Sequence, residues 1–138
     1  MIHKIAGLVV GLVVALVTMV LLEWGGNGLF NGGLPDDASA ESAVAVVRQP
    51  TGLLLFTVAG WFFGALLGGA TTIHIARAPA LAWGLALVVL IGAAARFAMM
   101  PHPTWMIIAG VVAPIAGVLL ALLLMRRRLA ANGKEAHQ

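Results

Sequence analysis

The chain lacks three things that most soluble proteins have. Among its 138 residues there is no cysteine and no tyrosine, and only 9% of the residues are charged. Without cysteine there are no disulfides and no thiolate metal ligands, and without tyrosine there is no phenolic proton donor. A soluble domain carries about 25% charged residues on its surface. Eight basic and five acidic residues are too few to cover a soluble particle of this size, so an ordinary soluble domain is excluded.

Long apolar runs are abundant instead. Hydrophobic residues make up 62% of the chain, and the mean hydropathy is +1.05. A helix needs about 20 mainly apolar residues to cross roughly 30 Å of hydrocarbon. Four segments meet this length, at residues 5–24, 51–76, 80–100 and 104–125. The alternating pattern of a membrane β-barrel is missing from them. We therefore predict an all-α integral membrane bundle of four transmembrane helices within residues 1–128, followed by a polar tail at 129–138.

Prolines mark the starts of three of these helices. Pro50, Pro79 and Pro103 stand just before or at the start of a predicted span, where a missing backbone N–H costs nothing. The first apolar run is longer than the core of a secretory signal peptide, which has about 7–15 residues. We expect it to be a retained helix.

The basic residues predict the orientation of the bundle. If both termini lie on one side, that side receives six lysines and arginines: Lys4, Arg77, Arg126, Arg127, Arg128 and Lys134. The other side receives two, Arg48 and Arg96. Cytoplasmic loops carry the excess of positive charge, so both termini are expected in the cytoplasm, and the three consecutive arginines favour contact with anionic membrane lipids.

The outer connection at residues 25–50 divides into two parts. Residues 25–33 are rich in glycine and asparagine, which is typical of a flexible turn. The acidic start at Pro35-Asp36-Asp37 then favours a helix running to Arg48. We predict a short amphipathic helix there, lying on the outer membrane surface.

Small residues recur at the spacing that lets membrane helices pack closely. Gly7 and Gly11 form one series in the first span, and Gly60, Gly64 and Gly68 form another in the second. Such series pack helices within a chain or between subunits, and their spacing does not distinguish these uses.

Proline also occurs within a span. Pro114 stands in the middle of the fourth span and leaves the carbonyl of Gly110 without its usual donor. A kink or local unwinding is expected at this position.

Four residues are candidates for a polar or ligand site. Glu23 at the end of the first span, Arg96 inside the third and His102 in the turn before the fourth all belong to the outer end of the bundle. An ionisable residue inside a span is costly and often functional. Two interpretations are open. In the first, Glu23 and Arg96 form a structural ion pair or are separate charges at the membrane interface. In the second, they form a ligand or proton site together with His102. Trp61 lies near mid-membrane and is expected to pack on a neighbouring helix or to line a cavity.

Four stretches carry a resemblance to known proteins. They are Glu23, Pro-Thr-Gly-Leu-Leu-Leu-Phe at 50–56, Trp-Phe-Phe-Gly-Ala-Leu-Leu-Gly-Gly at 61–69, and Met-Pro-His-Pro-Thr-Trp at 100–105. Together they resemble a group of small, uncharacterised bacterial four-span membrane proteins, over about residues 7–124. The resemblance implies a four-helix fold in the bacterial inner membrane, and it implies no particular activity.

Two classes of function follow. The first is a non-enzymatic accessory, assembly or oligomeric membrane protein, either a homo-oligomer or a subunit of a membrane complex, without a cofactor or metal. The alternative is a small transporter or ligand-binding protein that uses Glu23, Arg96, His102 and Trp61. No nucleophile with its base and no metal-ligand spacing is visible in the sequence. The net charge of +3 reflects cations at the inner membrane face and does not indicate nucleic-acid binding.

Overall fold

The part of the chain that the structure describes folds into four long α-helices. The computed structural model describes the backbone of residues 1–30, 50–99 and 102–135, and side chains as far as Arg126. The helices are α1 (Ile2–Phe30), α3 (Thr51–Ala76), α4 (Ala80–Met99) and α5 (Thr104–Glu135). Each contains a stretch long and apolar enough to cross a membrane. The predicted all-α bundle of four membrane-spanning helices is confirmed, and the chain is a multi-pass membrane protein.

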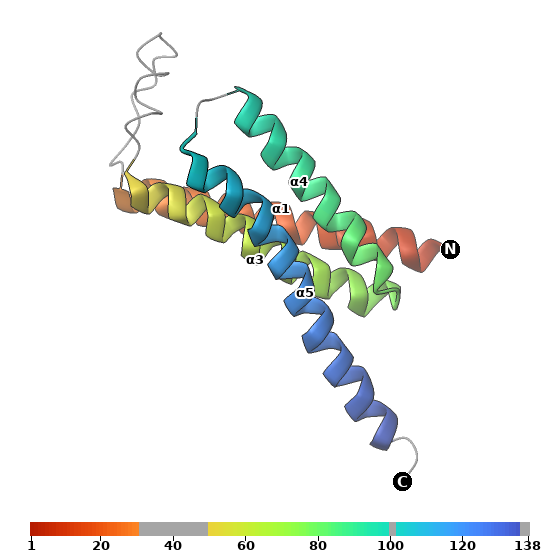
Figure 1. The fold of residues 1–138 in the computed structure, drawn as a ribbon. Coiled ribbons are helices and arrows are strands. Elements are labelled where there is room, and N and C mark those ends of the chain that lie inside the picture. Colours follow the sequence, from red (N-terminus) through yellow and green to blue (C-terminus); the bar gives the residue numbers. More distant parts are fainter. Residues whose placement is uncertain (31–49, 100–101, 136–138) are drawn as a thin grey trace.

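Helix α3 is the centre of the bundle. It packs against each of the other three helices, whereas α1 and α4 touch over a short stretch only, and α1 and α5 do not pack on each other. In the most apolar stretch of α3, 50% of the residues are buried, whereas in the most apolar stretch of α1 only 17% are. Figure 1 shows α1 and α3 side by side, α4 diverging from them, and the C-terminal part of α5 standing apart. The bundle is therefore splayed around one central helix.

Alanines form much of the inner part of the core between α3, α4 and α5. One cluster of buried residues comprises Ala65, Ile73, Ala82, Ala86, Val118 and Ala121. A second cluster, nearer the outer end, comprises Leu54, Trp61, Val89, Ala93 and Met106. Alanine lets helix backbones approach closely, which is what association in a bilayer requires because lipid tails are as apolar as leucine. Large apolar side chains accordingly remain on the outside, Val13 and Val17 of α1 among them.

A tight turn joins α3 to α4. Arg77 ends α3 in the left-handed conformation, with φ 51°, and its backbone N–H donates to the carbonyl of Ile73 at 2.9 Å. The helices on either side of this turn are consequently antiparallel neighbours, as the short connection predicts.

Helix α1 is longer than its apolar run. Residues 25–30 were predicted to begin a flexible turn, and that prediction is wrong, because α1 continues as a helix to Phe30. Gly26 is buried against α3, where an added Cβ would lie 2.8 Å from Cβ of Phe56, and Phe30 packs edge-on against the same Phe56 ring. This packing outweighs the low helix propensity of glycine.

Helix α5 also differs from its expected form. It continues past residue 125 to Glu135, so most of the predicted tail has a helical backbone. The helix is uninterrupted at Pro114, whose side chain is fully buried. Of the two outcomes predicted at Pro114, a kink or a local unwinding, the unwinding does not occur, because the residues on both sides of Pro114 stay helical. The amphipathic helix predicted between Asp36 and Arg48 lies outside the described residues.

Candidate functional site

Glu23 lies well inside α1 and does not end it. Seven more residues follow it in the helix, the last of them Phe30, which at 1.5 Å per residue is about 10 Å of further helix. The packing of Gly26 and Phe30 on α3 sustains this extension. The carboxylate is therefore carried on a rigid helical segment, so its position relative to α4 is set by the fold.

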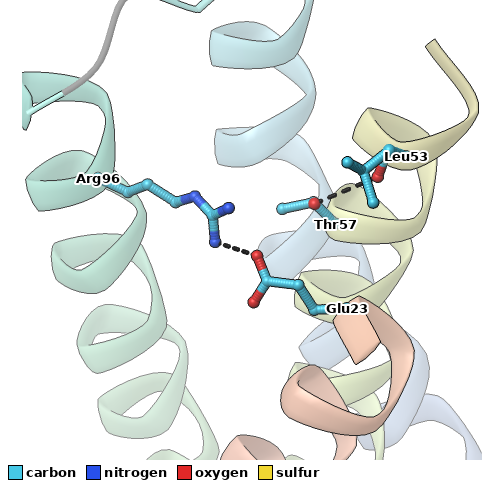
Figure 2. A network of polar contacts seen from close by, with 4 residues as sticks. All are labelled: Glu23, Leu53, Thr57 and Arg96. Atoms are coloured by element: carbon cyan, nitrogen blue, oxygen red, sulfur yellow. Dashed lines mark hydrogen bonds and ion pairs between the residues drawn. The ribbon is translucent and has the colours of Figure 1, made fainter. Parts of the chain in front are cut away.

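Arg96 lies in the last turn of α4 and reaches across to α1. Its Nη1 atom forms an ion pair with Oε1 of Glu23. Figure 2 shows the long arginine side chain extending from α4 toward the carboxylate on α1. Because α1 and α4 touch over a short stretch only, this ion pair is a direct link between two helices that diverge.

The ion pair is neither sealed in the core nor fully exposed. The side chain of Arg96 is 37% exposed and that of Glu23 is 34% exposed. A pair at a bundle edge retains part of the solvation or lipid-headgroup contact that a sealed pair loses, so its desolvation cost is moderate. Each group still has capacity for more partners, because a guanidinium has five N–H donors and a carboxylate accepts about four hydrogen bonds.

Thr57 of α3 lies beside the pair (Figure 2). It is buried, and its hydroxyl donates to the carbonyl of Leu53 one turn earlier at 3.3 Å. The same back-bonding occurs at Thr18, whose hydroxyl donates to the carbonyl of Val14 at 2.7 Å. Because the Thr57 donor is used within its own helix, the side of the site formed by α3 offers no hydroxyl proton to a ligand.

An aromatic series runs from α3 to the turn before α5. The rings of Trp61 and Phe97 meet edge to face with centroids 5.4 Å apart, and Phe97 meets the ring of His102 with centroids 5.3 Å apart. Gly110 of α5 makes room for the first two rings, because an added Cβ would lie 2.6 Å from each of them. Trp61 is thus packed on a neighbouring helix, which was one of its two predicted positions.

The structure brings the four candidate residues together as two pairs. Glu23 is joined to Arg96, and Trp61 is connected to His102 through Phe97. Phe97 connects the two pairs along α4, since it directly follows Arg96. Sequence reasoning missed Phe97, Thr57 and Gly110. The position of Phe97 next to the charged residue of α4 was the available signal, whereas nothing local marks Gly110 as a neighbour of Trp61.

The two predicted glycine series meet each other within the chain. A Cβ added at Gly11 would lie 2.6 Å from the carbonyl oxygen of Gly68, and one added at Gly68 would lie 2.6 Å from that of Gly11. Gly7 packs on Ala76, with an added Cβ 2.8 Å from its backbone nitrogen. Gly64 faces the carbonyl of Ala15, and Gly60 faces Met19. These glycines hold α1 on α3.

The glycine contact also buries a polar atom. The hydroxyl of Thr72 lies against Gly11, is completely buried, and has no hydrogen-bond partner among the described residues. A buried unpaired hydroxyl costs about 1–3 kcal/mol. The close approach of the two backbones is therefore maintained in spite of this cost.

The function of the chain has to be inferred from the geometry of the described residues. Within the described residues, no group of three or more histidine, aspartate or glutamate side chains is arranged to hold a metal ion. The resemblance to small bacterial four-span proteins stays a prediction. No protein-family model, curated protein or solved structure matches the chain.

Proposed function

We propose that the chain is a non-enzymatic accessory or assembly protein of the bacterial inner membrane, acting as a homo-oligomer or as a subunit of a membrane complex. The observation that supports this proposal is the ion pair between Glu23 and Arg96. Glu23 is the only aspartate or glutamate within the predicted spans, and Arg96 is the only lysine or arginine. Each neutralises the other within the chain. Charges within spans commonly pair with one another, and this pair links α1 to α4, which supports a role in holding a helix arrangement.

The location and orientation form part of the proposal. The six lysines and arginines near the termini and the α3–α4 turn favour a cytoplasmic position for that end. Lys4, Arg77 and Arg126 are exposed there, as charges in a headgroup region would be. The Glu23–Arg96 end is then periplasmic.

Native mass spectrometry in lipid nanodiscs tests the assembly proposal. The expected result is a fixed stoichiometry greater than one, formed with further copies of the chain or with one other membrane protein. The double variant Glu23→Gln, Arg96→Gln should weaken the bundle and lower the yield of the assembly together. A protein that is monomeric in lipid and co-purifies with no partner contradicts the proposal.

A ligand-binding or transport function is the second candidate, and the partial exposure of the pair favours it. Both side chains are slightly more than a third exposed. Phe97, which connects the rings of Trp61 and His102, directly follows Arg96 along the chain. Proteoliposome uptake assays test this candidate. Loss of uptake in Glu23→Gln, with folding and assembly intact, would support transport, whereas equal uptake in liposomes with and without protein would exclude it for the solutes tested.

A further inference from the structure

The ion pair lies on the border between the buried side and the lipid-facing side of each helix. On α1, Glu23 follows the exposed Val20 and precedes the buried Gly26. On α4, Arg96 follows the buried Ala93 and precedes the exposed Met99. One side of the pair is thus turned toward the bundle and the other toward the surrounding membrane.

We propose that this pair binds the headgroup of a zwitterionic phospholipid that carries a primary ammonium group, as phosphatidylethanolamine does. The phosphate would accept hydrogen bonds from Arg96, and the ammonium would donate to Glu23. The ion pair itself uses one guanidinium nitrogen and one carboxylate oxygen. The remaining N–H donors and oxygen lone pairs match the acceptor and the donor of such a headgroup.

The neutrality of the pair selects a zwitterion over an anion. A phosphate that approaches Arg96 also approaches Glu23, because the two side chains are in contact. The carboxylate repels an anionic headgroup and so offsets much of the attraction of the guanidinium. A headgroup with both charges removes this conflict by placing its ammonium at the carboxylate. A primary ammonium is favoured over a quaternary one because it has N–H donors.

The surroundings of the pair indicate a lipid and not a free zwitterion. The exposed neighbours on α1 are apolar: Val20 is 63% exposed, Leu21 59% and Trp24 76%. Met99, one turn beyond Arg96, is 82% exposed. Acyl chains can cover these side chains, and tryptophan is typical of the headgroup level. The acyl chains of a lipid whose headgroup binds the ion pair can therefore lie on these apolar side chains.

Native mass spectrometry of retained lipid tests the proposal. The full-length protein is released from vesicles with equal amounts of phosphatidylethanolamine, phosphatidylcholine and phosphatidylglycerol. The wild type should retain phosphatidylethanolamine about twofold to fivefold over each of the others, the range expected for a part-exposed charge contact. Free ethanolamine phosphate should not displace it. Equal retention of the three lipids overturns the proposal, and displacement by the free compound overturns the assignment to a lipid.

One double variant and two single variants distinguish recognition of the headgroup from a structural effect. Glu23→Gln leaves Arg96 uncompensated, so the preference should change to phosphatidylglycerol. Glu23→Gln, Arg96→Gln should show no preference. Arg77→Gln removes an exposed cation at the other end of the bundle and should leave the preference for phosphatidylethanolamine unchanged. An unaltered preference in both Glu23 variants would show that the lipid binds elsewhere.

The inference goes beyond the proposed function and can fail independently of it. Lipid selectivity is measured on each released species, whereas the assembly proposal depends on stoichiometry. A stable assembly without lipid preference would reject only the lipid site. A selective monomer would reject only the assembly.

Discussion

At the scale of single residues, the ion pair between Glu23 and Arg96 shows how much one contact contributes when charges are scarce. It joins helices that otherwise touch over a short stretch. Removing one partner leaves an unpaired charge at the edge of a bundle, which costs more than removing both. The pair is therefore expected to be more important for keeping α4 close to α1 than for total stability.

A double-mutant cycle measures this coupling. We expect Glu23→Gln and Arg96→Gln each to lower the free energy of unfolding, and the double variant to recover part of the combined loss. The coupling energy should be about 0.5–1.5 kcal/mol, between the values for exposed and buried pairs. Steric trapping in bicelles gives the three free energies. Arg77→Gln paired with Glu23→Gln is the control and should show no coupling; a coupling near zero for the ion pair itself would contradict the role assigned to it.

The hydroxyl of Thr72 gives a second prediction at this scale. It is buried without a partner among the described residues, so Thr72→Val should raise the free energy of unfolding by up to about 1 kcal/mol. Thr57→Val is the matched control, because the Thr57 hydroxyl donates to the carbonyl of Leu53, and it should give no gain. A loss of stability in Thr72→Val would reveal a partner for its hydroxyl. The same unfolding measurement serves both variants.

At the scale of elements, the α1–α3 contact depends on backbone approach. The carbonyl oxygens of Gly11 and Gly68 each occupy the space that a Cβ on the other residue would need. Carbonyl oxygens at such interfaces accept weak hydrogen bonds from Cα–H groups. Because a bilayer provides no hydrophobic force between apolar helices, this close fit is the main source of attraction between α1 and α3.

Alanine substitution tests the fit directly. Gly11→Ala and Gly68→Ala should each lower the free energy of unfolding by about 1–3 kcal/mol, because the added Cβ forces the backbones apart. Gly84→Ala on α4 is the matched control: nothing lies within 4 Å of the position of its Cβ, so stability should not fall. Distances between spin labels on α1 and α3 should increase only in the first two variants. Equal stability of all three proteins would mean that the two helices associate in another way.

At the scale of the whole molecule, the antiparallel arrangement of α3 and the three spans around it leaves the start of α1, the described end of α5 and the Arg77 turn at one end. We propose, from the excess of lysine and arginine at that end, that it faces the cytoplasm. The natural absence of cysteine makes the orientation simple to test, since any introduced thiol is the only one.

Single cysteines at two exposed positions report the orientation. Gly28→Cys lies at the outer end of α1 and should react with a membrane-impermeant maleimide in intact inner-membrane vesicles only when they are right side out. His3→Cys should react only in inverted vesicles or after permeabilisation. Both residues are exposed in the structure, so burial does not limit labelling. The reverse pattern would place the termini outside.

Much of the fold could be predicted because hydropathy is a property of each residue. Four apolar runs, with prolines and a short turn between them, were enough to predict the helices of the bundle. Errors arose where packing outweighs local preference. Gly26 is helical because it fits against Phe56, and a reading of α1 alone has no information about α3.

The candidate site was predictable only in its parts. Glu23 and Arg96 stood out because charges are rare in the spans, and the lengths of the spans indicated similar depth. Phe97 and Gly110 did not stand out, since an aromatic residue or a glycine in a membrane helix is common. Their importance comes from a contact between Trp61, Phe97 and Gly110 that joins three helices.

The sequence by itself determined that the chain spans a membrane, which four segments are the spans, and which few charges those spans contain. Only the tertiary structure decided that α3 is central, that the two glycine series face each other, and that Glu23 meets Arg96. The physical reason is that lipid and protein interior are equally apolar, so the sequence pattern does not distinguish the buried side of a helix from its lipid-facing side. Which side of a helix is buried depends on how well the surfaces of two helices fit each other, and this fit exists only when the helices are packed together.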